Sequence, residues 1–182
     1  FIPMLYRNQP AHYRNDVEVD VCFISVAPMD SRGKFSFSLI NSATKAIMDG
    51  AKTVVVEVNE RLPYVYSDYD GFIDISEVDY IVEGEHPEVV NLPSVRPNEI
   101  DIKVADYIAR EMCDGAVLEL GIGGMPSAVG EALAKSDLKD LGIHTEMLTD
   151  GFLALHKAGK ITNASKNVDR GKSVFTFAQG SD

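Results

Sequence analysis

The segment 116–151 holds the side chains of this chain that are best suited to chemistry. A short apolar run leads into three glycines, Gly121, Gly123 and Gly124, and an alanine-rich segment follows with Pro126 near its start. Glycine lets a ligand approach the main chain, and the start of a helix presents unpaired N–H groups. Anions and developing oxyanions are therefore the natural ligands of this turn.

A carboxylate follows in the next apolar segment, 142–147. Its residues are apolar at alternate positions, and it carries His144 and Glu146. In a strand these two side chains would point to the same face. Two polar residues on one face of an apolar strand indicate a functional site, and a solvent-exposed face is the alternative.

Strands and helices alternate along the chain, which predicts an α/β fold with open, mostly parallel sheets and flanking helices. Strands are expected at 17–28, 53–58, 72–78, 79–82, from 116, around 143 and at 174–177. Helices are expected at 42–50, 98–113, 126–135 and 150–156. The order strand, helix, strand at 17–58 predicts a right-handed parallel crossover.

Polar residues near the predicted helix starts and strand ends complete this prediction. Asn41 or Ser42 could cap the first helix, and Asn98 could cap the second. The apolar face of that second helix is predicted to consist of Ile100, Val104, Ile108 and Met112. Asp30 and Asn59 follow strands, so they are second candidates for a site, and turn chemistry is the alternative explanation.

A stretch with three prolines at 83–97 marks a domain boundary. We expect one domain at 1–90, a linker at 91–97 and a second domain at 98–182. The chain begins with Phe1 and has no initiator methionine, so we expect a fragment of a longer protein.

Composition and the absence of certain motifs exclude several classes of partner and ligand. A net charge of −11 argues against nucleic acid or an anionic membrane as the main partner. No apolar run approaches the ~20 residues of a membrane span and no signal peptide is evident, which predicts a cytoplasmic protein. Cys22 and Cys113 are expected to be buried reduced thiols, and four dispersed histidines do not predict a metal site. Position 126 is proline and no Walker lysine occurs, so the turn matches neither the dinucleotide fingerprint nor the P-loop.

The motif LGIGGMP at 120–126, followed by LGIHTEM at 141–147 and by Asp150-Gly151, resembles the acetyl-CoA hydrolase/transferase family, which includes 4-hydroxybutyrate and butyryl-CoA:acetate CoA-transferases. The resemblance extends over nearly the whole chain, with further matching segments at 20–35, 56–63 and 161–172. Met29 stands where the family usually has a second proline. Family members are also much longer, with a segment before this start and a further GVGGQ loop beyond residue 182.

The resemblance implies a fold, ligands and a nucleophile. It implies two related CoA-transferase-type domains, of which 1–90 is the latter part of the first and 98–182 the first part of the second. Glu146 would be the catalytic nucleophile, and coenzyme A or acyl-CoA the substrate, with no metal or redox cofactor. The residues implied to bind CoA are Gly121, Ile122, Gly123, Gly124 and Met125. We also expect a homo-oligomer, either a dimer or a tetramer.

Three functions fit these expectations. The first is a CoA-transferase for acetate, butyrate or 4-hydroxybutyrate, which would work by a ping-pong route through a glutamyl-CoA thioester. The second is an acyl-CoA hydrolase of the same family, in which water resolves that thioester. The third is a CoA-binding or nucleotide-binding module without catalysis.

Overall fold

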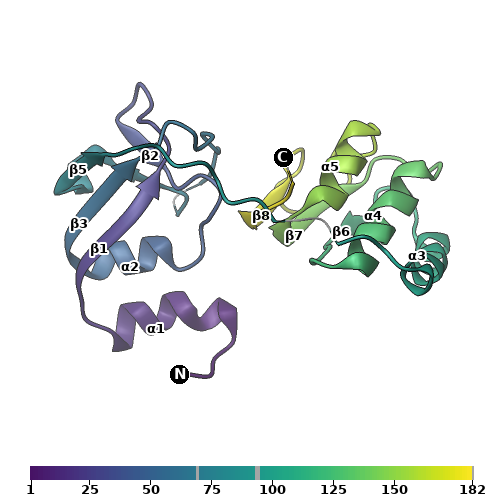
Figure 1. The fold of residues 1–182 in the computed structure, drawn as a ribbon, viewed down its shortest axis with the longest axis horizontal. Coiled ribbons are helices and arrows are strands. Elements are labelled where there is room, and N and C mark those ends of the chain that lie inside the picture. Colours follow the sequence, from purple (N-terminus) through teal and green to yellow (C-terminus); the bar gives the residue numbers. More distant parts are fainter. Residues whose placement is uncertain (69, 93–94, 182) are drawn as a thin grey trace. The chain divides into compact units, whose positions relative to one another are not determined.

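Each half of the chain builds a parallel β-sheet that carries helices on one of its faces (Figure 1). The computed structural model describes residues 1–68, 70–92 and 95–181, so two positions of the predicted linker, 93 and 94, lie outside the described residues. The two units are Phe1–Val90 and Asn91–Asp182. The α/β fold predicted from the sequence is confirmed, whereas the assignment of the units to two CoA-transferase-type domains stays a prediction.

The first unit is organised around a sheet with the strand order β1-β3-β5, and both of its pairings are parallel. Its strands are β1 (Val19–Val26), β3 (Ala51–Val58) and β5 (Tyr80–Glu83), and α2 (Thr44–Gly50) precedes β3 in the connection between the parallel strands β1 and β3. The small antiparallel pair β2 (Lys34–Ser36) and β4 (Phe72–Asp74) and the helical segments η1 (Tyr6–Asn8), α1 (Gln9–Asp16) and η2 (Ile75–Glu77) complete the unit.

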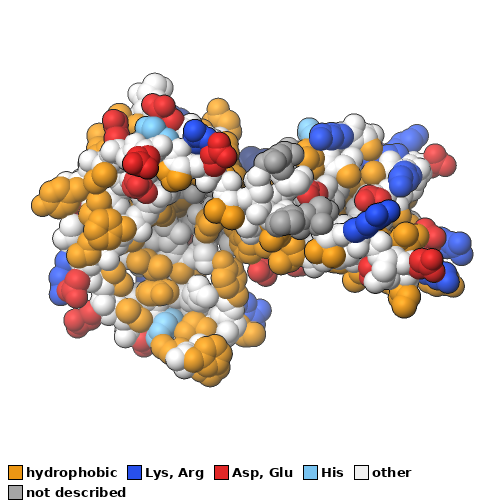
Figure 2. Space-filling model, viewed as in Figure 1, with side chains coloured by type: hydrophobic (Ala, Val, Ile, Leu, Met, Phe, Trp, Pro, Cys, Tyr) orange, Lys and Arg blue, Asp and Glu red, His pale blue; other side chains and the backbone are white. Residues whose placement is uncertain are grey.

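One face of this sheet is covered and the other is open. Val54 and Val56 point into the covered side, where they pack with Met48 of α2. The opposite face presents Phe23 and Tyr80, which are 76% and 63% exposed. Hydrophobic side chains over β5 are visible at the left of Figure 2. Among the described residues of this unit, the second face of the sheet is therefore exposed and hydrophobic, although parallel sheets are normally buried on both sides.

The second unit has a sheet with the order β6-β7-β8, and again both pairings are parallel. Its strands are β6 (Val117–Leu118), β7 (Gly142–Leu148) and β8 (Val174–Ala178), and its helices are α3 (Glu99–Glu111), α4 (Gly124–Lys135) and α5 (Asp150–Lys157). The helices pack on the side where Ile143 is buried, together with Leu133 and Phe152. No helix in the described part of the chain is long and apolar enough to cross a membrane.

The structure corrects the predicted starts and faces of two helices. For α2 neither Asn41 nor Ser42 is the cap, because the helix begins at Thr44 after Ala43, which makes no side-chain capping bond. For α3 the Asn98 cap is confirmed by bonds to two main-chain N–H groups. Ile100, however, is 72% exposed, and the buried residue of α3 is Ala105.

The α3 error has a geometric cause. A four-residue step drifts away from a helix period of 3.6, so Ile100 and Val104 leave the row that continues through Ile108 and Met112. Ala105 occupies the buried row in their place, and its small side chain lets α3 approach the core.

One strand prediction also changes. The segment expected as a strand at 72–78 ends at Asp74, where a capping box between Asp74 and Glu77 starts the short helix η2.

Helices α4 and α5 touch through their backbones. A Cβ atom added at Gly130 would lie 2.7 Å from the Cα atom of Gly151, and one added at Gly151 would lie 3.4 Å from Leu120 Cδ1. Because backbone atoms cannot swing away as a flexible side chain can, only glycine at position 130 allows this spacing.

Gly130→Ala should therefore destabilise the second unit. Overpacking of this kind costs about 1–3 kcal/mol, measured as the free energy of unfolding in urea. Gly50→Ala is the control, because a Cβ atom there would meet nothing within 4 Å. Equal stability of the two variants would mean that α4 and α5 are not in backbone contact.

Candidate functional site

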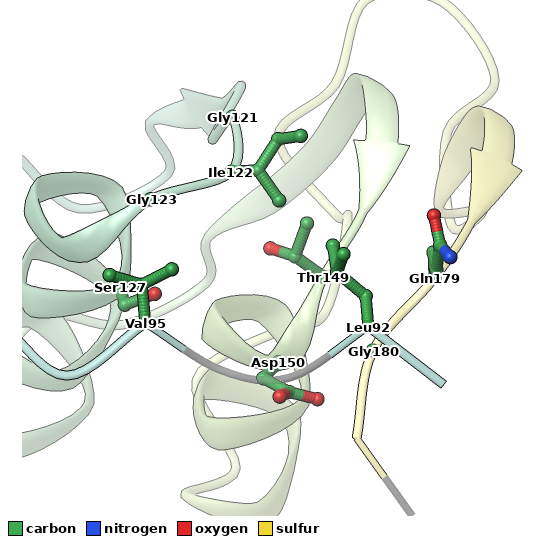
Figure 3. Close-up of a pocket in the computed structure, with 10 residues that line it drawn as sticks. All are labelled: Leu92, Val95, Gly121, Ile122, Gly123, Ser127, Thr149, Asp150, Gln179 and Gly180. Atoms are coloured by element: carbon green, nitrogen blue, oxygen red, sulfur yellow. The ribbon is translucent and has the colours of Figure 1, made fainter. Parts of the chain in front are cut away.

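A pocket of about 210 Å³ lies in the second unit, at the carboxyl ends of its parallel strands (Figure 3). This edge of a parallel sheet is where ligands bind in open α/β folds. Figure 3 shows the glycine turn on one side, Gln179 on the other and Thr149 between them. The described lining residues are Leu92, Val95, Gly121, Ile122, Gly123, Ser127, Thr149, Asp150, Gln179 and Gly180.

The glycine turn forms the wall that leads into α4. Gly123 is the N-cap of α4 with φ 127° and ψ 175°, a conformation that essentially only glycine adopts. Gly124 and Met125 open the helix, so their N–H groups have no carbonyl one turn earlier within the helix, and Pro126 has no N–H. The turn therefore offers main-chain donors at the positive end of the α4 dipole.

The start of α5 forms the facing wall. The carboxylate oxygens of Asp150 accept from the Ser181 N–H at 3.1 and 3.2 Å. A Cβ atom at Gly180 would lie 2.6 Å from Asp150 Oδ1, so this carboxylate lies directly against the backbone of residue 180. The Leu92 N–H donates to the Gly180 carbonyl at 2.8 Å, which holds that segment against the end of β8.

The charge of the lining determines what can enter. Asp150 is the single charged side chain among the described lining residues, and neither lysine nor arginine occurs there. A carboxylate opposes the entry of a phosphate, whereas Ile122, Leu92 and Val95 offer apolar contact. The pocket therefore suits an uncharged group, and any negative charge that develops on its oxygen would have to be stabilised by the main-chain N–H groups of the turn.

Glu146 lies on β7, outside the described lining of this pocket. Its side chain is exposed on the same face as His144, whereas Ile143 and Thr145 are buried on the other face. The two residues therefore share an open face of the strand, as the alternation in the sequence predicts. Among the described residues, no hydrogen bond or ion pair engages the Glu146 carboxylate.

The strand register relates Glu146 to the glycine turn. Leu118 of β6 pairs with Ile143 of β7, so Gly121 and Glu146 each lie three residues beyond one paired position. Thr149, which lines the pocket, follows Glu146 by three residues. At ~3.3 Å per residue, the backbone of Glu146 lies about 10 Å along the strand from Thr149 at the edge of the pocket.

The predicted residues thus separate into groups. Gly121, Ile122 and Gly123 line the pocket, while Gly124 and Met125 are the first residues of α4. Sequence reasoning missed the other lining residues, namely Leu92, Val95, Ser127, Thr149, Gln179 and Gly180. Ser127 belongs to α4 on the wall of the glycine turn. The others carry no local signal, because they come from segments that are distant in the sequence.

The second candidates, Asp30 and Asn59, are occupied by local structure. Asp30 Oδ1 accepts from the N–H groups of Lys34 and Arg32, and Tyr64 donates to Oδ2. The hydrogen bond from the Lys34 N–H is the main cause of a lowered pKa of the Asp30 carboxyl. Asn59 is buried and bonds to the Pro87 carbonyl and the Arg61 N–H. Turn chemistry accounts for both residues.

The cysteines are reduced, but one expectation about them was wrong. Cys22 is buried, and this burial raises the pKa of its thiol, whereas Cys113 is exposed. Over 1–68, 70–92 and 95–181, no group of three or more His, Cys, Asp or Glu side chains is arranged to hold a metal ion.

Comparison with known proteins gives consistent matches over this chain. Residues 2–93 match the acetyl-CoA hydrolase/transferase N-terminal domain. Butyryl-CoA:acetate CoA-transferase of Anaerostipes caccae is 46% identical over 99% of this chain and 41% of its own length. 4-Hydroxybutyrate coenzyme A transferase of Clostridium kluyveri is 38% identical over 99% of this chain and 41% of its own length.

A solved structure and a more distant relative complete the comparison. The crystal structure of RipA from Yersinia pestis superposes with a TM-score of 0.92 at 36% identity, covering 100% of this chain and 41% of that one. Acetyl-CoA hydrolase of Yarrowia lipolytica is 33% identical over 61% of this chain and 22% of its own length. The chain thus spans about 41% of the length of the CoA-transferases that it matches.

The family's N-terminal domain accounts for residues 2–93, and the CoA-transferases align over nearly the whole chain. That alignment includes the glycine turn and β7, which carries Glu146. The chain belongs to the acetyl-CoA hydrolase/transferase family.

Proposed function

We propose that the full-length protein containing this chain is an acyl-CoA:carboxylate CoA-transferase of the acetate, butyrate or 4-hydroxybutyrate type. The observation that supports the proposal is that Glu146 is an exposed carboxylate on β7, which pairs with β6 just before the glycine turn and leads to Thr149 in the pocket. A nucleophile must be accessible, and the donors for its oxyanion must lie nearby.

The reaction follows from these two elements. A Glu146 oxygen attacks the thioester carbonyl, the C–S bond breaks, and the CoA thiolate leaves with the electron pair. The thiolate then attacks the glutamyl carbonyl of the resulting anhydride and releases the first carboxylate, which leaves CoA on Glu146. The acceptor carboxylate repeats these steps in reverse, so the thioester bond is conserved and the kinetics are ping-pong.

The glycine turn would serve each tetrahedral step. Its N–H groups at residues 124 and 125 can donate to an oxyanion, and one such donor is worth about 2.7–4 kcal/mol in other enzymes. The apolar lining with its single carboxylate favours the acyl and thioester portion of the substrate here, with the phosphates of CoA elsewhere. No step calls for a metal or redox cofactor.

Transfer is favoured over hydrolysis by the pattern of relatives. The CoA-transferases align over 99% of the chain at up to 46% identity, whereas the acetyl-CoA hydrolase aligns over 61% at 33%. Binding without catalysis would leave the exposed Glu146 without a role.

Replacement of the nucleophile should abolish transfer. Glu146→Gln keeps the size of the side chain and removes its negative charge, so we expect no CoA adduct on the peptide that contains position 146 after incubation with acetyl-CoA. Mass spectrometry of that peptide and a coupled assay for butyryl-CoA formation measure the effect. Glu131→Gln, on the exposed side of α4, is the matched control and should retain activity. Transfer by Glu146→Gln would mean that another group is the nucleophile.

The fate of the adduct should separate transferase from hydrolase. Once the adduct has formed, added acetate should convert it to acetyl-CoA, because a carboxylate and not water resolves the thioester. Chromatography of the products measures acetyl-CoA against free CoA. Free CoA as the main product at saturating acetate would favour the hydrolase.

The glycine turn should tolerate no side chain at its positive-φ position. Gly123→Val adds strain at φ 127° and fills the turn, so we expect the Kd for CoA to rise about tenfold, equivalent to ~1.4 kcal/mol. Gly159→Val is the control, because φ there is 69° and the site is outside the pocket. Calorimetric titration with CoA measures both, and an unchanged Kd for Gly123→Val would remove this turn from the site.

A further inference from the structure

A buried lysine lies beside the strand that carries Glu146, and the transfer reaction does not use it. Lys166, in the loop between α5 and β8, is 4% exposed, and its Nζ donates to the carbonyls of Ile143 at 2.8 Å and Lys172 at 2.7 Å. Burial is the main cause of a lowered pKa of this ammonium group. A buried charge whose described hydrogen-bond partners are two carbonyls is costly to maintain, so its position calls for an explanation.

Asn163 completes the contact from the same loop. It is 6% exposed with φ 57°, and its Oδ1 accepts from the Ile143 N–H at 2.8 Å. Its Nδ2 donates to Ser173 Oγ at 3.1 Å, and its main-chain N–H donates to the Leu141 carbonyl at 3.1 Å. Asn163 therefore ties the start of β7 to the segment that leads into β8.

The main-chain N–H and C=O groups of Ile143 are therefore both hydrogen-bonded to side chains, the N–H to Asn163 and the C=O to Lys166. Pairing between β7 and β8 begins one residue later, at His144↔Val174. At Ile143, one residue before this pairing starts, Asn163 and Lys166 supply the hydrogen bonds that a neighbouring strand would otherwise make. The stem of Lys166 also crosses Gly142, where an added Cβ atom would lie 2.9 Å from Lys166 Cγ.

We propose that Asn163 and Lys166 are positioning residues for Glu146, because they fix the main chain of Ile143 three residues before the nucleophile. In a strand a slip of one residue turns every side chain to the opposite face. The hydrogen bonds to Ile143 therefore fix the register of β7, and this register keeps the Glu146 side chain on the exposed face of the strand. This inference rests on the proposed function, since it concerns the nucleophile named there.

The test uses the full-length protein and Lys166→Met, which keeps the length of the stem over Gly142 and loses the donors. We expect the single-turnover rate of CoA-adduct formation on the peptide containing Glu146 to fall about 100-fold, the scale expected for a misplacement of about 1 Å. The Kd for CoA should stay within about threefold, because the glycine turn is untouched. Lys166→Arg keeps the charge and N–H donors on a larger, planar group, and should recover part of the lost rate.

A matched control separates positioning from general stability. Lys160 also donates from its Nζ to a main-chain carbonyl in this unit, that of Ser136 after α4. Lys160→Met should therefore lower the unfolding free energy as Lys166→Met does while keeping the adduct rate. Equal rates for the two variants, or a loss of CoA affinity that parallels the loss of rate in Lys166→Met, would overturn the inference.

Two further variants keep the outcomes distinct. If Lys166→Met does not fold, Asn163→Gly decides, because it removes the acceptor for the Ile143 N–H while glycine adopts φ 57° without strain. A loss of adduct rate of about 100-fold with an unchanged Kd for CoA then supports the inference, and a rate near that of the parent contradicts it. Glu146→Gln runs in parallel. An adduct in Glu146→Gln would refute the proposed function itself, whereas its absence together with a fully active Lys166→Met would refute only the positioning role.

Discussion

The backbone contact between Gly130 and Gly151 is the constraint on which the pocket depends. Both helices that meet there begin at the pocket, because Gly123 caps α4 and Thr149 caps α5. A side chain at Gly130 would force the helices apart and move the two walls with them. A residue outside the described pocket lining therefore sets the separation between the glycine turn and Asp150.

Strand β7 is held firmly at its start. Leu141 donates to the Lys160 carbonyl and accepts from the N–H groups of residues 162 and 163, and Gly142 donates to the Ala116 carbonyl. Side chains from the loop then bind Ile143. Glu146 follows on the exposed face of the strand. A rigid strand with an open face suits a nucleophile, because the main chain fixes its direction while substrate can still reach it.

How much the sequence could predict depended on the range of the interactions. Alternation of strands and helices predicted the α/β fold, and Asn98 was recognisable as a cap because its partners lie within three residues. Ala105 was missed as the buried residue of α3, since a small residue gives no strong apolar signal. The wall formed by Gln179 and the burial of Lys166 could not be predicted, because both depend on strand pairing and on a loop that returns over many residues.

The uncovered sheet face of the first unit affects how these 182 residues behave on their own. Phe23 and Tyr80 form an exposed apolar surface on a chain that is acidic overall. Copies of this chain repel one another because each has a net charge of −11. Salt shortens the reach of that repulsion to about 10 Å at 0.1 M and leaves the attraction between apolar faces intact. Because repulsion weakens with salt and apolar attraction does not, these residues should stay dispersed in low-salt buffer and associate as ionic strength rises.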